Sequence, residues 1–421
     1  MPDSDHSLTP MPRATRQPRV LIVLPQLPQD PGSGAPRAVL SMGELLAREG
    51  FDVRCLAVTA CETPQAQGRA RDLLRSSGVS VRTQRVPYAG GTAVCWTFEK
   101  AGVTHLLLDT PGRQVSNWEQ SHGRAFDALF TAELGDFAPA VLLTYGASPP
   151  ERARHAQAQN AGCRVVLSIQ NWGYLVPGCL DYADAVLACS AFCARHYQTT
   201  VGLRADHLPC PIVHQEVVAD EHRPIFFTMV NPAPEKGLML VARIAEELGT
   251  SRPDIPMLFI ESRSRAGALR AAGLAGGFDL SRHANVMVAP SVPLPRDIFG
   301  PTRALLAPSV WLEPAGRVAA EAVCNAVPPL VSDRGGLAEL GNGGGFVLGL
   351  PEQLTEQTRE PVSRSDAQPW LELICRLADD DAFYQEACQR ARAAANLYLP
   401  EHLGPRYASY FGRIAGCTPA L

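Results

Sequence analysis

Two glutamates at a junction between a strand and a helix are the first residues whose types and spacing could do chemistry. The segment 308–339 reads PSVWLEPAGRVAAEAVCNAVPPLVSDRGGLAE and places seven residues between Glu313 and Glu321. A strand-like run precedes it at 303–307, and the apolar spacing predicts a helix over about 315–325. Gly316 falls at the start of this helix, where the missing side chain lets a ligand approach the backbone. The free N–H groups of such a helix start favour a phosphate or diphosphate.

A lysine marks a second junction of the same kind. Of the 38 basic residues, only Lys100 and Lys236 are lysines. Lys236 lies in the run NPAPEKG, between a predicted strand at 225–230 and an amphipathic helix. Such a junction is at the carboxyl edge of a parallel sheet, where α/β folds bind ligands. A compact lysine charge suits an anionic ligand there, whereas a merely solvated cation would oppose the helix dipole.

The elements that must position these residues follow an α/β pattern. The opening has a continuous apolar strand at 19–25, a loop with Gly32 and Gly34, a helix at 38–49 and a strand at 53–58. This order is of the Rossmann type, although a glycine loop alone is weak evidence because tight turns also need glycine. Further strands are predicted at 104–109, 141–145, 164–169 and 185–188.

Length and composition predict two domains. A chain of 421 residues is too long for one ordinary core. We expect a disordered lead at 1–17, an N-terminal Rossmann-like domain at 18–214 and a C-terminal one at 222–398, with residues 399–421 packing back on the first. The run 209–224 mixes proline with charge and has weak periodicity, so we interpret it as the linker between the domains.

Charge and cysteine content narrow the function classes. The net charge of −4 gives no reason to expect a nucleic-acid partner, and the twelve cysteines contain no Cys-x-x-Cys pair. We interpret them as buried thiols of a cytoplasmic protein. No apolar run reaches the ~18 residues that a membrane span needs. A group of arginines near a predicted first-domain helix suggests weak membrane association, with a solvated face as the alternative; it comprises Arg69, Arg71, Arg75, Arg82 and Arg85.

The motifs in 308–339 resemble the nucleotide-binding signature of family 4 glycosyltransferases. The resemblance rests on the order Pro-Ser, Trp, Glu-Pro-x-Gly-Arg, a second Glu and Ser-Asp-Arg-Gly-Gly-Leu-x-Glu. It implies the GT-B fold, in which two Rossmann-like domains face a central cleft. It also implies a hexosyltransferase-like enzyme that moves a sugar from a nucleotide-diphosphate sugar to an acceptor hydroxyl with retention. The family needs no metal and no cofactor beyond the nucleotide sugar as co-substrate.

The resemblance also implies roles for individual residues. Glu321 would bind the ribose hydroxyls, and Glu313 would face the transferred sugar. The backbone amides of Ala315, Gly316 and Arg317 would hold the diphosphate, whose charge Lys236 would neutralise. The loop with Gly32 and Gly34 would lie across the cleft, near donor and acceptor.

The sequence departs from the family pattern at two places. A loop that often carries a histidine near the donor sugar has Gln170 and Asn171 here, followed by Tyr174. Their amides can bond sugar hydroxyls but carry no charge; alternatively, Asn171 is a turn residue and the aromatic side chains pack the cleft wall. Many relatives have an arginine shortly before the lysine, where this chain has Asn231. Arg263 or Arg317 is then the candidate for a second cation.

Other functions remain open from the sequence. The fold also serves sugar-nucleotide epimerases, which need an acid and a base that we do not identify. A non-catalytic subunit that binds nucleotide and regulates a partner is a further alternative. An inverting transferase would need a base such as Asp109 or His122. The acceptor, whether a small molecule, a glycan or a lipid-linked sugar, is not identified by the sequence.

Overall fold

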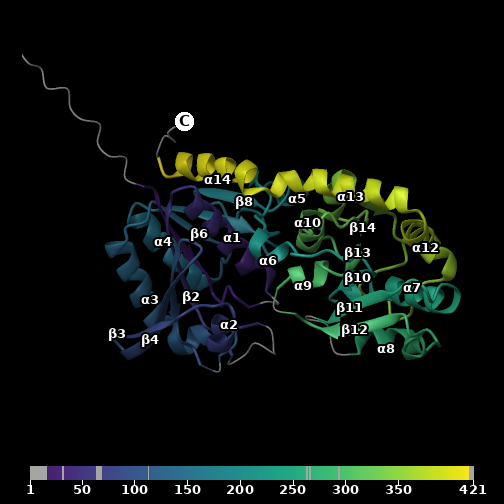
Figure 1. The fold of residues 1–421 in the computed structure, drawn as a ribbon. Helices are drawn as coiled ribbons and strands as arrows, with labels where there is room; N and C mark the ends of the chain where they lie inside the picture. The colour runs from purple at the N-terminus through teal and green to yellow at the C-terminus, as the bar shows by residue number, and fades with distance from the viewer. Residues whose placement is uncertain are drawn as a thin grey trace, which may run out of the picture.

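Two α/β units lie side by side in the protein, as Figure 1 shows. The computed structural model describes residues 17–30, 33–62, 69–111, 113–261, 264, 267–292 and 294–416. Two of the predicted site residues, Gly32 and Arg263, lie outside the described residues, as does nearly all of the predicted lead at 1–17.

The first sheet contains nine strands within the described residues, in the order β3-β4-β5-β2-β1-β6-β7-β8-β9. The bounds are β1 Arg19–Val23, β2 Asp52–Val58, β3 Arg82–Tyr88, β4 Gly91–Lys100, β5 Val103–Leu108, β6 Val141–Thr144, β7 Arg164–Ile169, β8 Ala185–Ala188 and β9 Asp206–His207. Neighbouring strands are parallel, except that β4 is antiparallel to β3 and β5. Val20 and Ile22 face one core and Leu21 and Val23 face another, which explains the continuous apolar sequence of β1.

The hairpin of β3 and β4 is absent from the sequence prediction. Every residue of β3 is at least partly exposed, so burial imposes no clear apolar alternation on its sequence. Arg82 and Arg85 lie on this strand, whose Thr83 hydroxyl accepts a hydrogen bond from Arg71 at 3.5 Å. Arg71, on α2 (Ala70–Ser76), places its guanidinium over the Trp96 ring at 4.7 Å.

The helices of the first unit follow the parallel strands. Helix α1 (Gly34–Arg48) begins four residues before its predicted start at 38, because Pro36 is compatible with a first helical turn. The other helices are α3 Trp118–Asp136, α4 Pro149–Asn160 and α5 Ala191–Val201. The loops that connect strands to helices collect at the carboxyl edge of the sheet, which faces the second unit.

The second sheet is wholly parallel within the described residues, in the order β12-β11-β10-β13-β14-β15. Its strands are β10 Phe226–Val230, β11 Met257–Glu261, β12 Val286–Pro290, β13 Thr302–Ala307, β14 Pro329–Ser332 and β15 Phe346–Leu348. Its helices are α7 Leu238–Ser251, α8 Ala268–Ala275, α9 Arg296–Phe299, α10 Arg317–Cys324, α11 Leu337–Gly344, α12 Arg364–Asp379 and α13 Asp381–Ala395. Strand β15 begins three residues later than the predicted run at 343–347, because Gly343 and Gly344 end α11.

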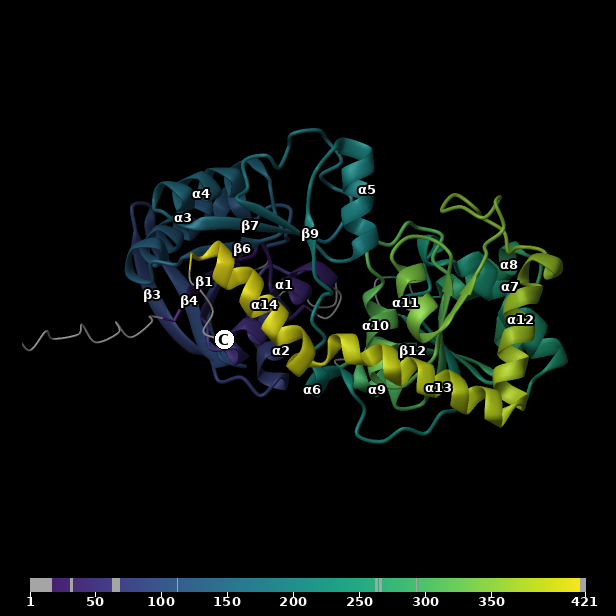
Figure 2. The same cartoon turned by 90° about the horizontal axis from the view of Figure 1, so that it is seen from above.

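Two segments cross between the units. One is the hinge segment 209–224, which contains the short helix α6 (His214–Val217). The other leads from α13 to α14 (Pro400–Ile414), which returns over the first unit in Figure 2. Leu403, Tyr407 and Phe411 of α14 share a core with residues of α1 and β1. The Tyr407 hydroxyl also donates to the Pro209 carbonyl oxygen at 3.0 Å, so α14 is hydrogen-bonded to the start of the hinge segment.

A cluster of ion pairs fixes the hinge segment to α1. The Arg37 guanidinium on α1 bonds Glu44 at 3.0 Å and Glu216 of α6 at 2.7 Å. Lys100, at the end of β4, reaches the other oxygen of Glu216 at 3.1 Å. Burial by itself would raise the pKa of Glu216, but Arg37 and Lys100 outweigh it and lower this pKa.

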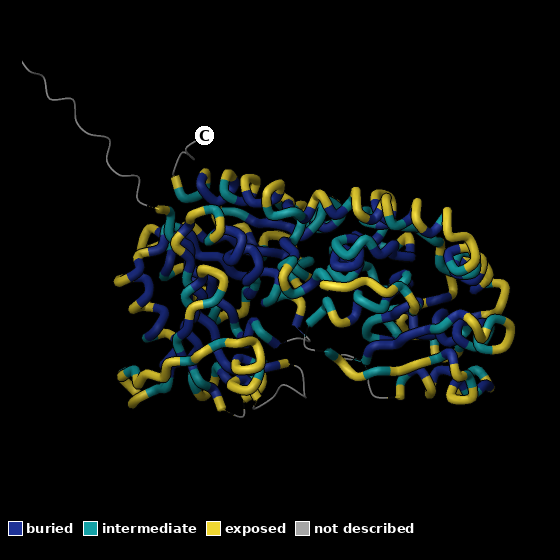
Figure 3. The backbone as a smooth tube through the Cα atoms, viewed as in Figure 1, coloured by how far each residue is buried: buried dark blue, intermediate teal, exposed yellow. Residues whose placement is uncertain are grey.

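Figure 3 shows burial concentrated in the central strands and the faces of the covering helices. His105 on β5 is fully buried and stacks on Phe98 with ring centroids 4.3 Å apart. Among the described residues, neither ring nitrogen of His105 has a hydrogen-bond partner. None of the helices in the described ranges is both long enough and apolar enough to cross a membrane.

Candidate functional site

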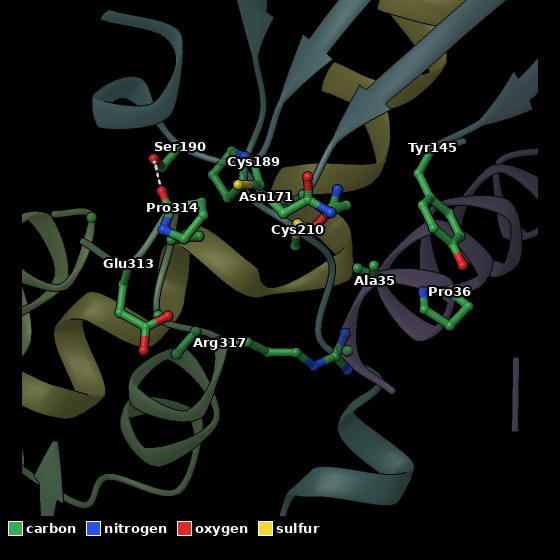
Figure 4. A pocket seen from close by; sticks show the side chains of 18 of the residues that line it. Ala35, Pro36, Tyr145, Asn171, Cys189, Ser190, Cys210, Glu313, Pro314 and Arg317 are labelled. Carbon is green, nitrogen blue, oxygen red and sulfur yellow. Dashed lines mark hydrogen bonds between the residues drawn. The ribbon is translucent and has the colours of Figure 1, made fainter. Parts of the chain in front are cut away.

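A large cavity lies between the two units. It has a volume of about 920 Å³ and is lined by loops at the carboxyl edge of the first sheet and by the segment around α10. Figure 4 shows Ala35, Pro36 and Tyr145 on one side, and Glu313 and Arg317 on the other. A smaller cavity of about 210 Å³ continues the site beneath α10. It shares Glu313, Gly316 and Arg317 with the larger one.

Helix α10 begins at Arg317, and the predicted first residue, Ala315, belongs to the preceding loop. Gly316 is the N-cap, and its φ of 83° is a left-handed conformation. The helical conformation therefore does not extend back to Ala315. A Cβ at Gly316 would approach Leu337 Cδ2 to 2.4 Å, so the site needs glycine here for space as well. No side chain caps the helix, and Ala315, Gly316 and Arg317 all line the larger cavity.

Glu313 is held by its backbone and by its carboxylate. Its carbonyl oxygen accepts a hydrogen bond from the Gly336 N–H at 2.7 Å. A Cβ on Gly335 would lie 2.3 Å from that oxygen, and one on Gly336 would lie 2.6 Å from the Pro314 carbonyl oxygen, which explains why the motif has two glycines there. The Glu313 carboxylate accepts from the Ser309 hydroxyl at 3.1 Å and forms an ion pair with Lys236.

Lys236 lies at the carboxyl end of β10, in a short 3₁₀ turn (Pro234–Lys236) before α7. Its ammonium group pairs with Glu313 and lies 4.9 Å from the centre of the Trp311 ring. Gly237 follows with a φ of 88°, and a Cβ there would clash with the Pro308 carbonyl oxygen at 2.1 Å. The two predicted chemical residues, 77 positions apart in sequence, are thus in direct contact.

Glu321, which is predicted to bind the ribose hydroxyls, pairs with an arginine of its own helix. Its carboxylate accepts from Arg317 Nε at 2.8 Å, one helical turn away, and the residue is only 9% exposed. Glu321 lines neither of the two cavities. The Arg317 guanidinium, by contrast, extends into the larger cavity in Figure 4. Its buried Nη1 has no hydrogen-bond partner among the described residues.

Polar side chains of the loop after β7 form hydrogen bonds within the first unit. Gln170 donates to the Ser168 hydroxyl at 2.7 Å, and Asn171 Oδ1 accepts from the Gly173 N–H at 2.8 Å. Both residues still line the larger cavity. Tyr174 does not line either cavity, because its hydroxyl is turned to the carbonyl oxygen of Tyr145.

This loop also makes contact with the second unit. The Trp172 indole N–H donates to the Leu312 carbonyl oxygen at 2.6 Å. Ser190, after β8, donates its hydroxyl to the carbonyl oxygen of Pro314, as the dashed line in Figure 4 marks. The backbone on both sides of Glu313 is therefore bonded across the cavity to the first unit.

Asn231 lines the smaller cavity. It adopts a left-handed φ of 59°, and its Oδ1 accepts from the Ser264 N–H at 2.8 Å.

Gly34, at the start of α1, lines the larger cavity. Burial raises the pKa of Asp109 and lowers that of His122, but neither residue lines either cavity.

Several lining residues were not found from the sequence. Five come from loops without a recognisable motif, and His207 and Arg406 come from β9 and α14, so only the fold brings them together: Gln26, Ser33, Glu62, Gln114, Ser116, His207 and Arg406. Within the described ranges, no three His, Cys, Asp or Glu side chains are grouped so that they could hold a metal ion.

Solved structures similar to this one cover nearly the whole chain. Sucrose-phosphate synthase from Thermosynechococcus elongatus is 16% identical and matches with a TM-score of 0.65 over 95% of this chain and 100% of its own. The catalytic domain of starch synthase IV from Arabidopsis thaliana, bound to ADP and acarbose, is 12% identical, with a TM-score of 0.62 over 94% and 100%. HepE from Anabaena, in complex with UDP and glucose, is 13% identical, with a TM-score of 0.60 over 94% and 99%.

At the level of sequence alone, no protein-family model and no curated protein matches the chain. The structural likeness spans both units and the cleft between them, in agreement with the fold predicted from the motifs. The chain has the GT-B fold.

Proposed function

We propose that this protein is a glycosyltransferase of the family 4 type, which transfers a sugar from a nucleotide-diphosphate sugar to an acceptor hydroxyl. The observation that carries the proposal is an anion site at the carboxyl edge of the second sheet. There the uncapped start of α10, the Lys236 side chain and the Arg317 side chain line the two cavities, which share Glu313, Gly316 and Arg317. Similar folds whose structures contain ADP or UDP support a nucleotide as the ligand.

The positive groups suit a leaving diphosphate. As the bond between the sugar C1 and the phosphate oxygen breaks, negative charge develops on that oxygen. Lys236 would then exchange its ion pair with Glu313 for the diphosphate, and the N–H groups at the start of α10 would bind the same charge. The Glu313 carboxylate, released from the lysine, would face the transferred sugar and position its hydroxyls.

We further propose retention of configuration without a metal. The acceptor oxygen forms its bond to C1 on the face that the diphosphate leaves, and the acceptor proton passes to the departing phosphate oxygen. This step needs no protein base. Glu321 would act through Arg317, by fixing the guanidinium that borders the diphosphate, as well as through the ribose.

The test is a screen of nucleotide sugars for binding and slow hydrolysis in the presence of a chelator. We expect one donor to release its nucleoside diphosphate, and Lys236→Ala to slow this release by about 100-fold or more. Glu321→Ala should weaken donor binding, whereas Arg392→Ala, an exposed position on α13, should match the wild type. If no nucleotide sugar binds, or if turnover requires a divalent cation, the proposal fails. The anomer of a transferred product, read by NMR, decides between retention and inversion.

A further inference from the structure

Two carbonyl groups in the loop that carries Glu313 accept hydrogen bonds from the first unit. The Leu312 carbonyl oxygen accepts from the Trp172 indole N–H at 2.6 Å. The Pro314 carbonyl oxygen accepts from the Ser190 hydroxyl, along the dashed line in Figure 4. The Glu313 carbonyl oxygen, between them, accepts from a second-unit N–H. The backbone of Glu313 is therefore restrained by both units, and the bonds from the first unit lie on either side of it.

The anion site, by contrast, is built within the second unit. The Glu235 carbonyl oxygen accepts from the Val310 N–H at 3.1 Å and from the Trp311 N–H at 3.0 Å. Lys236 directly follows Glu235, so these two bonds fix the backbone beside the lysine. The start of α10 belongs to the same unit. The groups that would bind a diphosphate thus keep their positions through second-unit contacts, whereas the Glu313 backbone depends on the first unit as well.

The Trp172 indole is fixed by aromatic side chains of α5. Its ring lies edge-on to the His196 ring, with centroids 4.5 Å apart, and its centroid is 5.5 Å from that of the Tyr197 ring. The hydroxyl of the buried Tyr197 donates to the Asn171 carbonyl oxygen at 2.7 Å, which holds the backbone directly before Trp172. Trp172 lines neither cavity, so any effect on a ligand must pass through the residues that it contacts.

The Ser190 side chain has two hydrogen-bonding roles. Ser190 is the N-cap of α5, and its hydroxyl oxygen accepts from the Cys193 N–H at 2.9 Å. The hydroxyl proton is donated to the carbonyl oxygen of the buried Pro314. The first role supports a helix of the first unit, while the second reaches the Glu313 loop. A hydroxyl can fill both roles at once, whereas a carboxylate can fill only the first.

We propose that Trp172 and Ser190 are positioning residues for the transfer step, which act through the Glu313 carboxylate. By bonding the carbonyl oxygens on either side of Glu313, they set the direction in which its side chain meets the transferred sugar. Because a misplacement of about 1 Å in a catalytic group can cost about 100-fold in rate, even a small relaxation of this loop slows the reaction. Binding of the diphosphate is not affected. This inference rests on the proposed transferase function.

Two conservative variants of the full chain remove only the donated hydrogen bonds. Trp172→Phe keeps an aromatic ring against His196 but lacks the indole N–H. Ser190→Asp keeps an N-cap acceptor for Cys193 but, as a carboxylate, cannot donate to Pro314. With the donor found in the hydrolysis screen, we expect each variant to lower kcat for hydrolysis about 10-fold and to leave the Kd of the nucleoside diphosphate, measured by calorimetry, within about two-fold of wild type. Ser190→Thr, which keeps the hydroxyl, should retain the wild-type kcat.

A double-mutant cycle and a control variant test how the effect reaches the substrate. In a Glu313→Ala background no carboxylate remains to be positioned, so adding Trp172→Phe should lower kcat by less than about two-fold further. The control is Arg195→Ala. Arg195 also lies on α5 and pairs with Glu339 of the second unit at 2.8 Å, but its side chain is 66% exposed. Such a pair contributes little, so the control should match the wild type.

The outcomes separate this inference from the function on which it rests. Donor hydrolysis that is absent from the wild type overturns the transferase proposal itself. Where hydrolysis is present, an unchanged kcat in either Trp172→Phe or Ser190→Asp overturns the positioning role. A loss of nucleotide affinity as large as the loss in kcat, or a full 10-fold further loss in the Glu313→Ala background, overturns it as well. A rate for Arg195→Ala as low as that of Trp172→Phe would assign the effect to contact between the units in general and refute the role of the Glu313 loop.

Discussion

Replacing Arg37 by methionine should destabilise the first unit strongly. The guanidinium pairs with Glu44 and Glu216, and the side chains of Arg37 and Glu44 are only 15% and 7% exposed. Removing one partner of a buried pair leaves the other charge uncompensated, which costs about 3–5 kcal/mol. For a domain of about 200 residues, this corresponds to a lower melting temperature by roughly 6–20 °C. Lys100 still pairs with Glu216, so the isolated charge is chiefly that of Glu44.

Scanning calorimetry of the full chain measures this loss, and Arg223→Met is the matched control. Arg223 pairs with Glu221 at 2.8 Å in the same hinge segment, but both side chains are more than two-thirds exposed, at 79% and 72%. Such a pair contributes about 0–1 kcal/mol, so its loss should shift the melting temperature by a few degrees at most. Equal shifts for Arg37→Met and Arg223→Met would refute the argument from burial.

The pH dependence of this loss has a definite sign. The pKa of Glu216 is lowered from its ordinary value of 4.5, so its ion pairs contribute stability above that pH. This contribution is lost as the pH falls through the lowered pKa of the folded state. The difference between wild type and Arg37→Met should therefore be constant from pH 7 to 5.5 and shrink below 4.5.

Two further changes test the packing around the hinge segment and the site. Burial, with smaller effects of Lys100 and Arg37, lowers the pKa of His105 to about 3. Below pH 6.5 the imidazole is therefore protonated in the unfolded chain but stays neutral in the folded chain. Wild type should lose about 2 kcal/mol of stability from this residue between pH 7 and 5, and His105→Phe should abolish that part of the loss in thermal melts at both pH values. Gly335→Ala directs a Cβ at the Glu313 carbonyl oxygen and should slow donor hydrolysis at least 10-fold. The control is Gly343→Ala, where no atom lies within 4 Å of the added Cβ, and it should leave the rate of donor hydrolysis unchanged. Equal rates for the two variants would contradict the packing argument.

The fold and the grouping of candidate residues at the start of α10 could be predicted because their signals are local in sequence. Parallel strands buried on both faces are continuous apolar runs, and the motif around Glu313 keeps its residues within one strand, loop and helix. Lys236 was found because a lysine at a strand-to-helix junction is unusual in an arginine-rich chain. The GT-B prediction was confirmed because these patterns recur in both halves.

The remaining features depend on contacts between distant segments. Arg37 and Glu216 are 179 positions apart, and nothing in either neighbourhood indicates the other. Glu62 and Gln114 lie in loops without a motif and meet only because β2 and β5 are adjacent in the sheet. The ion pair of Arg317 with Glu321 is different, since its four-residue spacing on a helix could have been recognised from the sequence.

The return of α14 to the first unit has a consequence for biosynthesis. The core around α1 contains Leu403, Tyr407 and Phe411, which are synthesised after all the described strands of the second unit. Roughly 200 residues are added between the end of the first sheet and this helix, which takes roughly 10–40 s at ~5–20 residues per second. During that time the apolar face of α1 lacks its partner, while the second unit, encoded between the two parts, already has all of its own strands. The N-terminal unit is therefore the last to be completed, although it is the first to be synthesised.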